Sequence, residues 1–160
     1  MRRLVYGCLA GLAASVPMTA TMARLRQRLP DADRYELPPA ELTAGAGFPH
    51  SPAATMVAHF AYGALTGALF GLQKRRSPIL GAAFGVGVWS ASYLGWIPLS
   101  GLLAPATRHP RPRVALMLIA HVVWGASLAS AQREIEGAED GFTGRRLPAS
   151  APAARERGTR

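Results

Sequence analysis

The distribution of charged residues divides the chain into four long apolar stretches. Residues 4–23, 53–72, 77–107 and 114–132 contain no Asp, Glu, Lys or Arg. A helix of about 20 apolar residues crosses the ~30 Å hydrocarbon core of a bilayer, and a helix satisfies its own backbone hydrogen bonds without water. The stretches lack the regularly spaced polar positions of helices in a soluble bundle. The pattern therefore predicts an all-α fold, an integral membrane four-helix bundle.

The chain of 160 residues is long enough for one domain. We expect a transmembrane domain over residues 1–136, with a polar connection at 26–52. Its four helices are expected at about 4–25, 53–72, 79–97 and 114–132. Residues 137–160 are rich in Gly, Pro, Ala and Arg without periodicity, which predicts a disordered basic tail.

Glycines recur at four-residue spacing on the expected helices, where they share one face. They are Gly7 and Gly11 in the first helix, Gly63, Gly67 and Gly71 in the second, Gly81 and Gly85 in the third, and Gly125 in the fourth. Such faces let helices approach closely in lipid. The stripe favours a retained first helix over a cleaved signal peptide, which Arg2-Arg3 and the apolar run after it would also fit. We expect packing or assembly through these faces, and they also allow a homo-oligomer.

A short phrase occurs twice, as AHFAYGA at 58–64 and AHVVWGA at 120–126. Its histidine, the aromatic residue three positions on and the glycine four positions on share one helical face. The candidate intramembrane polar site is therefore His59, Tyr62, His121 and Trp124. Each phrase follows a helix with a Gly-x-x-x-Gly motif, which predicts two repeated helical hairpins in the same orientation.

Three interpretations of the paired histidines remain open. Each imidazole can hydrogen-bond a neighbouring helix and fix the packing. The pair can instead line the path of a small transporter or proton-conducting protein, because an imidazole changes its charge near neutral pH. A third interpretation is axial ligation of haem or binding of a metal ion. The helices contain no second histidine pair and no carboxylate to complete a metal site, so we predict no cofactor and no metal site.

The net charge of +9 comes from arginines that flank the apolar stretches. This placement fits anchoring of helix ends in a lipid bilayer and argues against nucleic acid as a partner. Residues 1–3, 73–77 and 133–160 together carry eleven Lys and Arg, and residues 24–52 and 98–113 together carry seven. The difference predicts that both termini are cytoplasmic. No motif of a hydrolase or a phosphate loop is present, so we do not predict an enzyme.

Two further groups of residues lie near the expected membrane surfaces. Trp89, Tyr93 and Trp96 lie toward the end of the third helix and predict part of an interfacial aromatic belt. The connection at 26–52 carries Asp31, Asp33, Glu36 and Glu41, which are expected on a solvated face.

The second half of the chain resembles a known family. The features are GAAFG at 81–85, IPLSGL at 97–102 and AHVVWG at 120–125, followed by Arg133-Glu134. They resemble the YagU-like bacterial inner-membrane proteins over roughly residues 53–135. The resemblance implies a multi-pass protein of a bacterial inner membrane. It supplies no activity, since that family is a domain of unknown function.

Overall fold

The structure is a computed structural model that describes residues 1–34, 36, 38–47 and 51–144. Within these residues the fold is all-α and contains no strand, which confirms the predicted helical bundle. Its longer elements are α1 (Arg2–Arg26), α2 (Pro38–Gly45), α3 (Pro52–Phe70), α4 (Pro78–Ser90) and α6 (Arg111–Phe142). Short elements complete it: η1 (Asp31–Asp33), η2 (Ala91–Trp96), α5 (Ile97–Leu99) and η3 (Ala106–Arg108). Four helical segments, α1, α3, Pro78–Leu99 and α6, are long and apolar enough to cross a membrane.

The helices α3 and α4 begin with the same local device, a Ser-Pro pair. Proline suits the first turn because its missing N–H has no helical partner to lose. The Ser51 hydroxyl accepts a hydrogen bond from the Ala54 N–H at 3.4 Å, and the Ser77 hydroxyl accepts one from the Leu80 N–H at 3.1 Å. These caps satisfy backbone donors that the first turn would otherwise leave unpaired.

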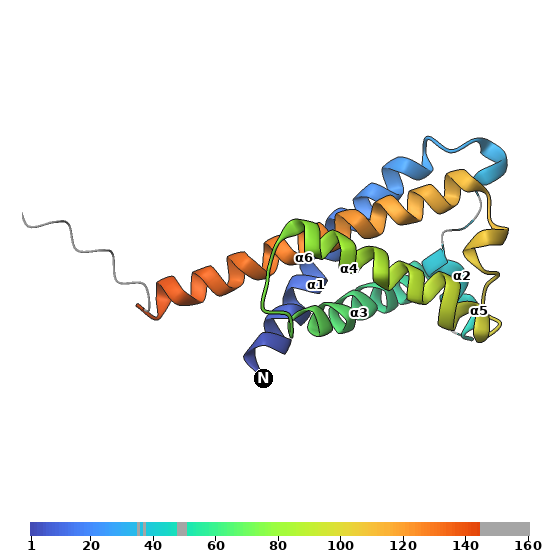
Figure 1. Ribbon diagram of the computed structural model, residues 1–160. Coiled ribbons are helices and arrows are strands. Elements are labelled where there is room, and N and C mark those ends of the chain that lie inside the picture. Colours follow the sequence, from blue (N-terminus) through green and yellow to red (C-terminus); the bar gives the residue numbers. More distant parts are fainter. Residues whose placement is uncertain (35, 37, 48–50, 145–160) are drawn as a thin grey trace, which may run out of the picture.

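The four long helices pack in the order α3, α1, α6, α4. Contacts are extensive within the pairs α1–α3 and α4–α6, and between α1 and α6, whereas α3 and α4 approach each other at few points. The pairs α1–α3 and α4–α6 correspond to the predicted hairpins, and the α1–α6 contact joins them. Figure 1 shows α2 and α5 at one end of the bundle, and the N-terminus at the opposite end, where α6 extends past the other helices.

All eight predicted packing glycines are buried in these two pairs. A Cβ added to Gly11 would lie less than 3.0 Å from the Gly63 carbonyl oxygen, and one added to Gly85 would lie equally close to that of His121. The glycines therefore let the helices touch backbone to backbone. Because the chain itself occupies these faces, assembly with another copy would need a different surface.

The two pairs differ in register by one helical turn. In the first pair Gly11 lies against Gly63, the glycine of the repeated phrase. In the second pair Gly85 lies against His121, four residues before the corresponding glycine, Gly125. The backbone of His121 therefore lies where α4 and α6 approach closely, whereas His59 lies one turn beyond the close approach of α1 and α3.

The end of α6 corrects the sequence prediction. The helix was expected to stop near residue 132 and a disordered tail to begin at 137, but α6 continues to Phe142. Two ion pairs join the extension to the rest of the chain: Arg2 with Glu139, and Arg76 Nη2 with Glu136 Oε1 at 3.2 Å. Because these contacts join residues far apart in the chain, no periodic pattern near residues 133–142 predicts the extension of the helix. The tail prediction for 145–160 falls outside the described residues.

The sequence predicted one regular helix at about 79–97. The structure instead divides this membrane-length segment into α4, η2 and α5. After Ser90 the chain forms one stretch of π-helix, η2, before the short α5. Gly95 within η2 has non-helical dihedrals, with φ −114° and ψ −108°. A π-bulge places an additional residue in the turn and often marks a functional site.

Candidate functional site

The four candidate residues of the repeated phrase line one cavity. It has a volume of about 300 Å³, and His59, Tyr62, His121 and Trp124 all lie on its wall. Helices α1, α2, α3 and α6 and the α4–η2 segment enclose it. Most of the wall is apolar, and the volume lies at the lower end of the range for small-molecule pockets.

His121 is buried, with 6% of its surface exposed. Its Nδ1 lies 2.8 Å from the Met117 carbonyl oxygen on the preceding turn of α6. A carbonyl oxygen only accepts, so Nδ1 carries the proton and donates it to this bond. In a neutral ring Nε2 then holds a lone pair, and no described residue hydrogen-bonds to it. His121 therefore offers the cavity a hydrogen-bond acceptor in a fixed orientation.

His59 lies on the same wall without a comparable partner. Its Nε2 is buried, and no hydrogen-bond partner occurs among the described residues. Buried polar atoms are nearly always satisfied, so an orphan of this kind calls for a water molecule or a ligand.

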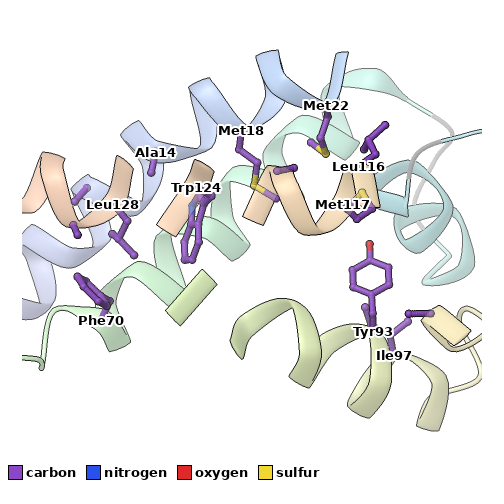
Figure 2. Packing of buried hydrophobic residues seen from close by; sticks show 14 of the residues in the cluster. Ala14, Met18, Met22, Phe70, Tyr93, Ile97, Leu116, Met117, Trp124 and Leu128 are labelled. Atoms are coloured by element: carbon purple, nitrogen blue, oxygen red, sulfur yellow. The ribbon is translucent and has the colours of Figure 1, made fainter. Parts of the chain in front are cut away.

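Trp124 connects the two hairpins on the cavity wall. Its Nε1 donates to the Gly11 carbonyl oxygen across 3.4 Å, and its ring stacks on Phe84 with centroids 6.1 Å apart. Figure 2 shows Trp124 and Tyr93 projecting from α6 and η2 into the space between the helices. The indole is thereby fixed from both sides of the bundle.

Tyr62 forms a polar bridge between α3 and η2. Its hydroxyl lies 2.8 Å from Ser92 Oγ, and Ser92 Oγ lies 2.8 Å from the Val88 carbonyl oxygen. The single serine proton goes to that carbonyl, so the Tyr62 hydroxyl is the donor to Ser92. This arrangement leaves no proton on either hydroxyl for a third group.

Tyr93 departs from the sequence prediction of an interfacial belt residue. It is 6% exposed, lines the cavity, and places its ring edge-on to His121 at 6.4 Å between centroids. Trp96, by contrast, is 46% exposed, as a surface aromatic should be. The π-helix accounts for the difference, because the additional residue in its turn changes which side chains face inward. Sequence reasoning missed Tyr93 for that reason.

A second cavity, of about 480 Å³, lies beside the first between α1, α2 and the start of α3. His59, Pro39 and Thr43 border both cavities. The second cavity also reaches Glu36 and Ser51 from the polar connection. His59 therefore separates an apolar compartment from a more polar one.

A buried ion pair fixes α2 over the cavity. The Arg113 side chain at the start of α6 is 3% exposed and pairs with Glu41 of α2. The sequence predicted a solvated face for Glu41, but its carboxylate pairs with the buried Arg113 side chain. The two residues are 72 positions apart, and neither carries a local signal of the pairing.

No metal site is found at the cavity. No group of three or more His, Cys, Asp or Glu in the described part of the chain is placed to hold a metal ion.

The described residues form an all-α bundle with four membrane-length helices around a largely apolar cavity. Comparison with protein-family models, with curated proteins and with solved structures gives no match.

Proposed function

We propose that this chain is a multi-pass membrane protein that binds a small, uncharged molecule inside its helix bundle. The observation that carries the proposal is the orphaned Nε2 of His59 on the wall of an apolar cavity. A ligand that pairs with this nitrogen removes the cost of leaving it unsatisfied, which is about 1–3 kcal/mol for a buried polar group.

The composition of the wall supports an uncharged ligand. A charged group would lose its hydration in an apolar cavity without an opposite charge to compensate. Among the described residues of the lining there is no Asp, Glu, Lys or Arg, and the hydrogen-bonding side chains include His59 and His121. As neutral imidazoles, His59 and His121 can therefore hydrogen-bond a ligand without adding a net charge to the cavity wall.

The glycine faces serve this function as a scaffold. Packing through Gly-rich faces, the interpretation first drawn from the sequence, describes how the cavity walls are held together. Gly63 lies next to Tyr62, and Gly85 supports the backbone of His121. Close packing at both positions fixes two of the cavity's polar side chains.

The cellular setting of the proposal is a bacterial inner membrane with both termini in the cytoplasm. The surplus of basic residues at the terminal end of the bundle supports this orientation. The proposal also places the chain with the YagU-like proteins, on the strength of the motifs at 81–85, 97–102 and 120–125. A homo-oligomer would be formed through surfaces other than the buried glycine faces.

Transport is the second candidate function, because His59 borders both cavities. In a transporter the ligand would pass from one cavity to the other, and in a binding protein it would stay in the apolar one. Flux of a bound probe across sealed vesicles distinguishes the two, since only a transporter releases it on the opposite side.

Photolabelling of the protein in detergent tests ligand binding. The probe is a medium-chain alkanol that carries a diazirine, and labelled peptides are mapped by mass spectrometry. We expect saturable labelling of the cavity segments around Met117 and Ser92, lost in the His59→Gln/His121→Gln variant and kept in Gly87→Ala. Gly87 is the control because a Cβ there meets no atom within 4 Å. Labelling that never saturates and spreads over all exposed apolar residues would refute the proposal.

A further inference from the structure

The apolar cavity reaches the surface of the bundle between α3 and η2. Two of its lining residues, Tyr62 of α3 and Trp96 of η2, are 39% and 46% exposed. Toward the terminal end of the bundle this side is closed, because Phe70 and Phe84 pack with ring centroids 5.1 Å apart. Elsewhere α3 and α4 approach at few points, so the opening is lateral.

In a membrane-spanning bundle this opening is expected at a depth that faces lipid. Tyr62 is ten residues into α3, or about 15 Å from the start of the helix at 1.5 Å per residue. That distance is near the middle of a ~30 Å hydrocarbon core. The apolar side chains of Leu65 and Leu94, 68% and 52% exposed, lie close to Tyr62 and Ser92 in sequence on the same two elements.

Two contacts made by Tyr62 cross this opening. Its hydroxyl donates to Ser92 Oγ at 2.8 Å, and its ring lies 6.3 Å from that of Trp96, measured between centroids. Both partners belong to η2, the π-helical segment that also contains the non-helical Gly95. A segment without regular α-helical hydrogen bonding is well suited to move relative to α3.

His121 defines the polar group that a ligand must carry. Because its Nδ1–H is committed to the Met117 carbonyl oxygen, its Nε2 accepts but does not donate in the neutral ring. The Tyr62 and Ser92 protons are likewise committed, to Ser92 and to Val88. A matching ligand therefore brings a hydrogen-bond donor into an otherwise apolar cavity.

We propose that the cavity takes a lipophilic molecule with a hydroxyl group, an alcohol or a phenol, directly from the bilayer through the opening between α3 and η2. Tyr62 and Ser92 form the gate, and His121 Nε2 accepts a hydrogen bond from the ligand's hydroxyl group. This inference rests on the proposed binding function and adds to it the ligand class and the route of entry.

A reversible cross-link across the gate tests the route. In a Cys8→Ser background, Tyr62→Cys and Ser92→Cys are joined by a short bis-methanethiosulfonate linker in lipid vesicles that contain the diazirine alkanol. We expect saturable labelling at Met117 to fall roughly tenfold with the gate cross-linked and to return after reduction. The Tyr62→Cys variant alone, treated with the same reagent, is the control and should keep its labelling.

Two further measurements complete the test. Tyr62→Phe keeps the ring but removes the hydrogen bond, so we expect faster labelling of the cavity than in the unmodified protein. An unlabelled alkanol should compete roughly tenfold better than its methyl ether, which has the same chain but no proton to donate.

The possible failures are distinct. Equal labelling with the gate cross-linked and reduced would overturn lateral entry and point to the second cavity as the route. Equal competition by the alkanol and its ether would overturn the ligand class. Absence of saturable labelling in every state would instead refute the binding function itself.

Discussion

Gly85 of α4 packs directly on the backbone carbonyl of His121 in α6. A Cβ at Gly85 would approach that oxygen to less than 3.0 Å, a separation that real side chains essentially never show. The glycine therefore sets the distance between two cavity walls and holds the backbone that carries the His121 ring. In this hairpin the close-packing motif and the candidate site are one structural unit.

Gly85→Ala should destabilise the bundle because the added methyl group has no room against the His121 backbone. Overpacking of this kind costs about 1–3 kcal/mol. Gly87→Ala is the matched control on the same helix, and it should be neutral or stabilise by up to about 1 kcal/mol, since alanine is the better helix former and its Cβ meets open space. Thermal unfolding in detergent, followed by circular dichroism, measures both. Equal effects of the two substitutions would show that the predicted helix contact does not exist.

Glu41→Gln should loosen α2 from the bundle. The substitution removes the charge of Glu41 from its buried ion pair with Arg113, and breaking a buried pair in this way costs about 3–5 kcal/mol. The double variant Glu41→Leu/Arg113→Leu removes both charges and should recover much of the stability. Unfolding in detergent gives the free energies, and limited proteolysis reports on α2. A Glu41→Gln protein as stable as the original would contradict the pairing.

The crossing pattern predicts which side of the membrane each connection faces. In the Cys8→Ser background, Gly137→Cys and Ser77→Cys should react with an impermeant maleimide from one side of sealed vesicles. Thr107→Cys should react from the other side, because α4, η2 and α5 separate it from Ser77 by one crossing. Labelling of all three positions from a single side would rule out a membrane-spanning bundle.

His59→Leu should weaken ligand binding without weakening the fold. The substitution removes the orphaned Nε2, so the ligand-free protein should unfold at the same temperature or a higher one. His121→Leu should instead lower the unfolding temperature, because it removes the hydrogen bond to Met117 and a buried, packed ring. Thermal unfolding without ligand separates the cases. Equal destabilisation by both would indicate that His59 has a structural partner after all.

The overall arrangement could be predicted from the sequence because its signals are local. Charge-free stretches mark the four long helices, and the Gly7–Gly11 and Gly81–Gly85 spacings mark the faces that meet. The repeated phrase was informative for the same reason, since three- and four-residue spacing places side chains on one face. These features do not depend on which distant segment becomes the neighbour.

The remaining features depend on contacts between distant segments. The extension of α6 to Phe142 is held by Arg2 and Arg76, and the pairing of Glu41 with Arg113 joins α2 to the start of α6. The one-turn difference in register follows from the packing of whole helices, so two similar phrases place their histidines in different backbone surroundings. The π-helix placed Tyr93 inward for a similar reason, because tertiary packing overrode a regular helix.

A structure of the protein in a lipid nanodisc tests ligand binding most directly. We predict density for a non-protein molecule in the cavity of about 300 Å³, with a polar atom within hydrogen-bonding distance of His59 Nε2 or His121 Nε2. Exchange for the diazirine alkanol should place its hydroxyl at the same position. A cavity filled by collapsed Trp124 and Tyr93 side chains, with both imidazoles hydrogen-bonded to protein, would contradict it.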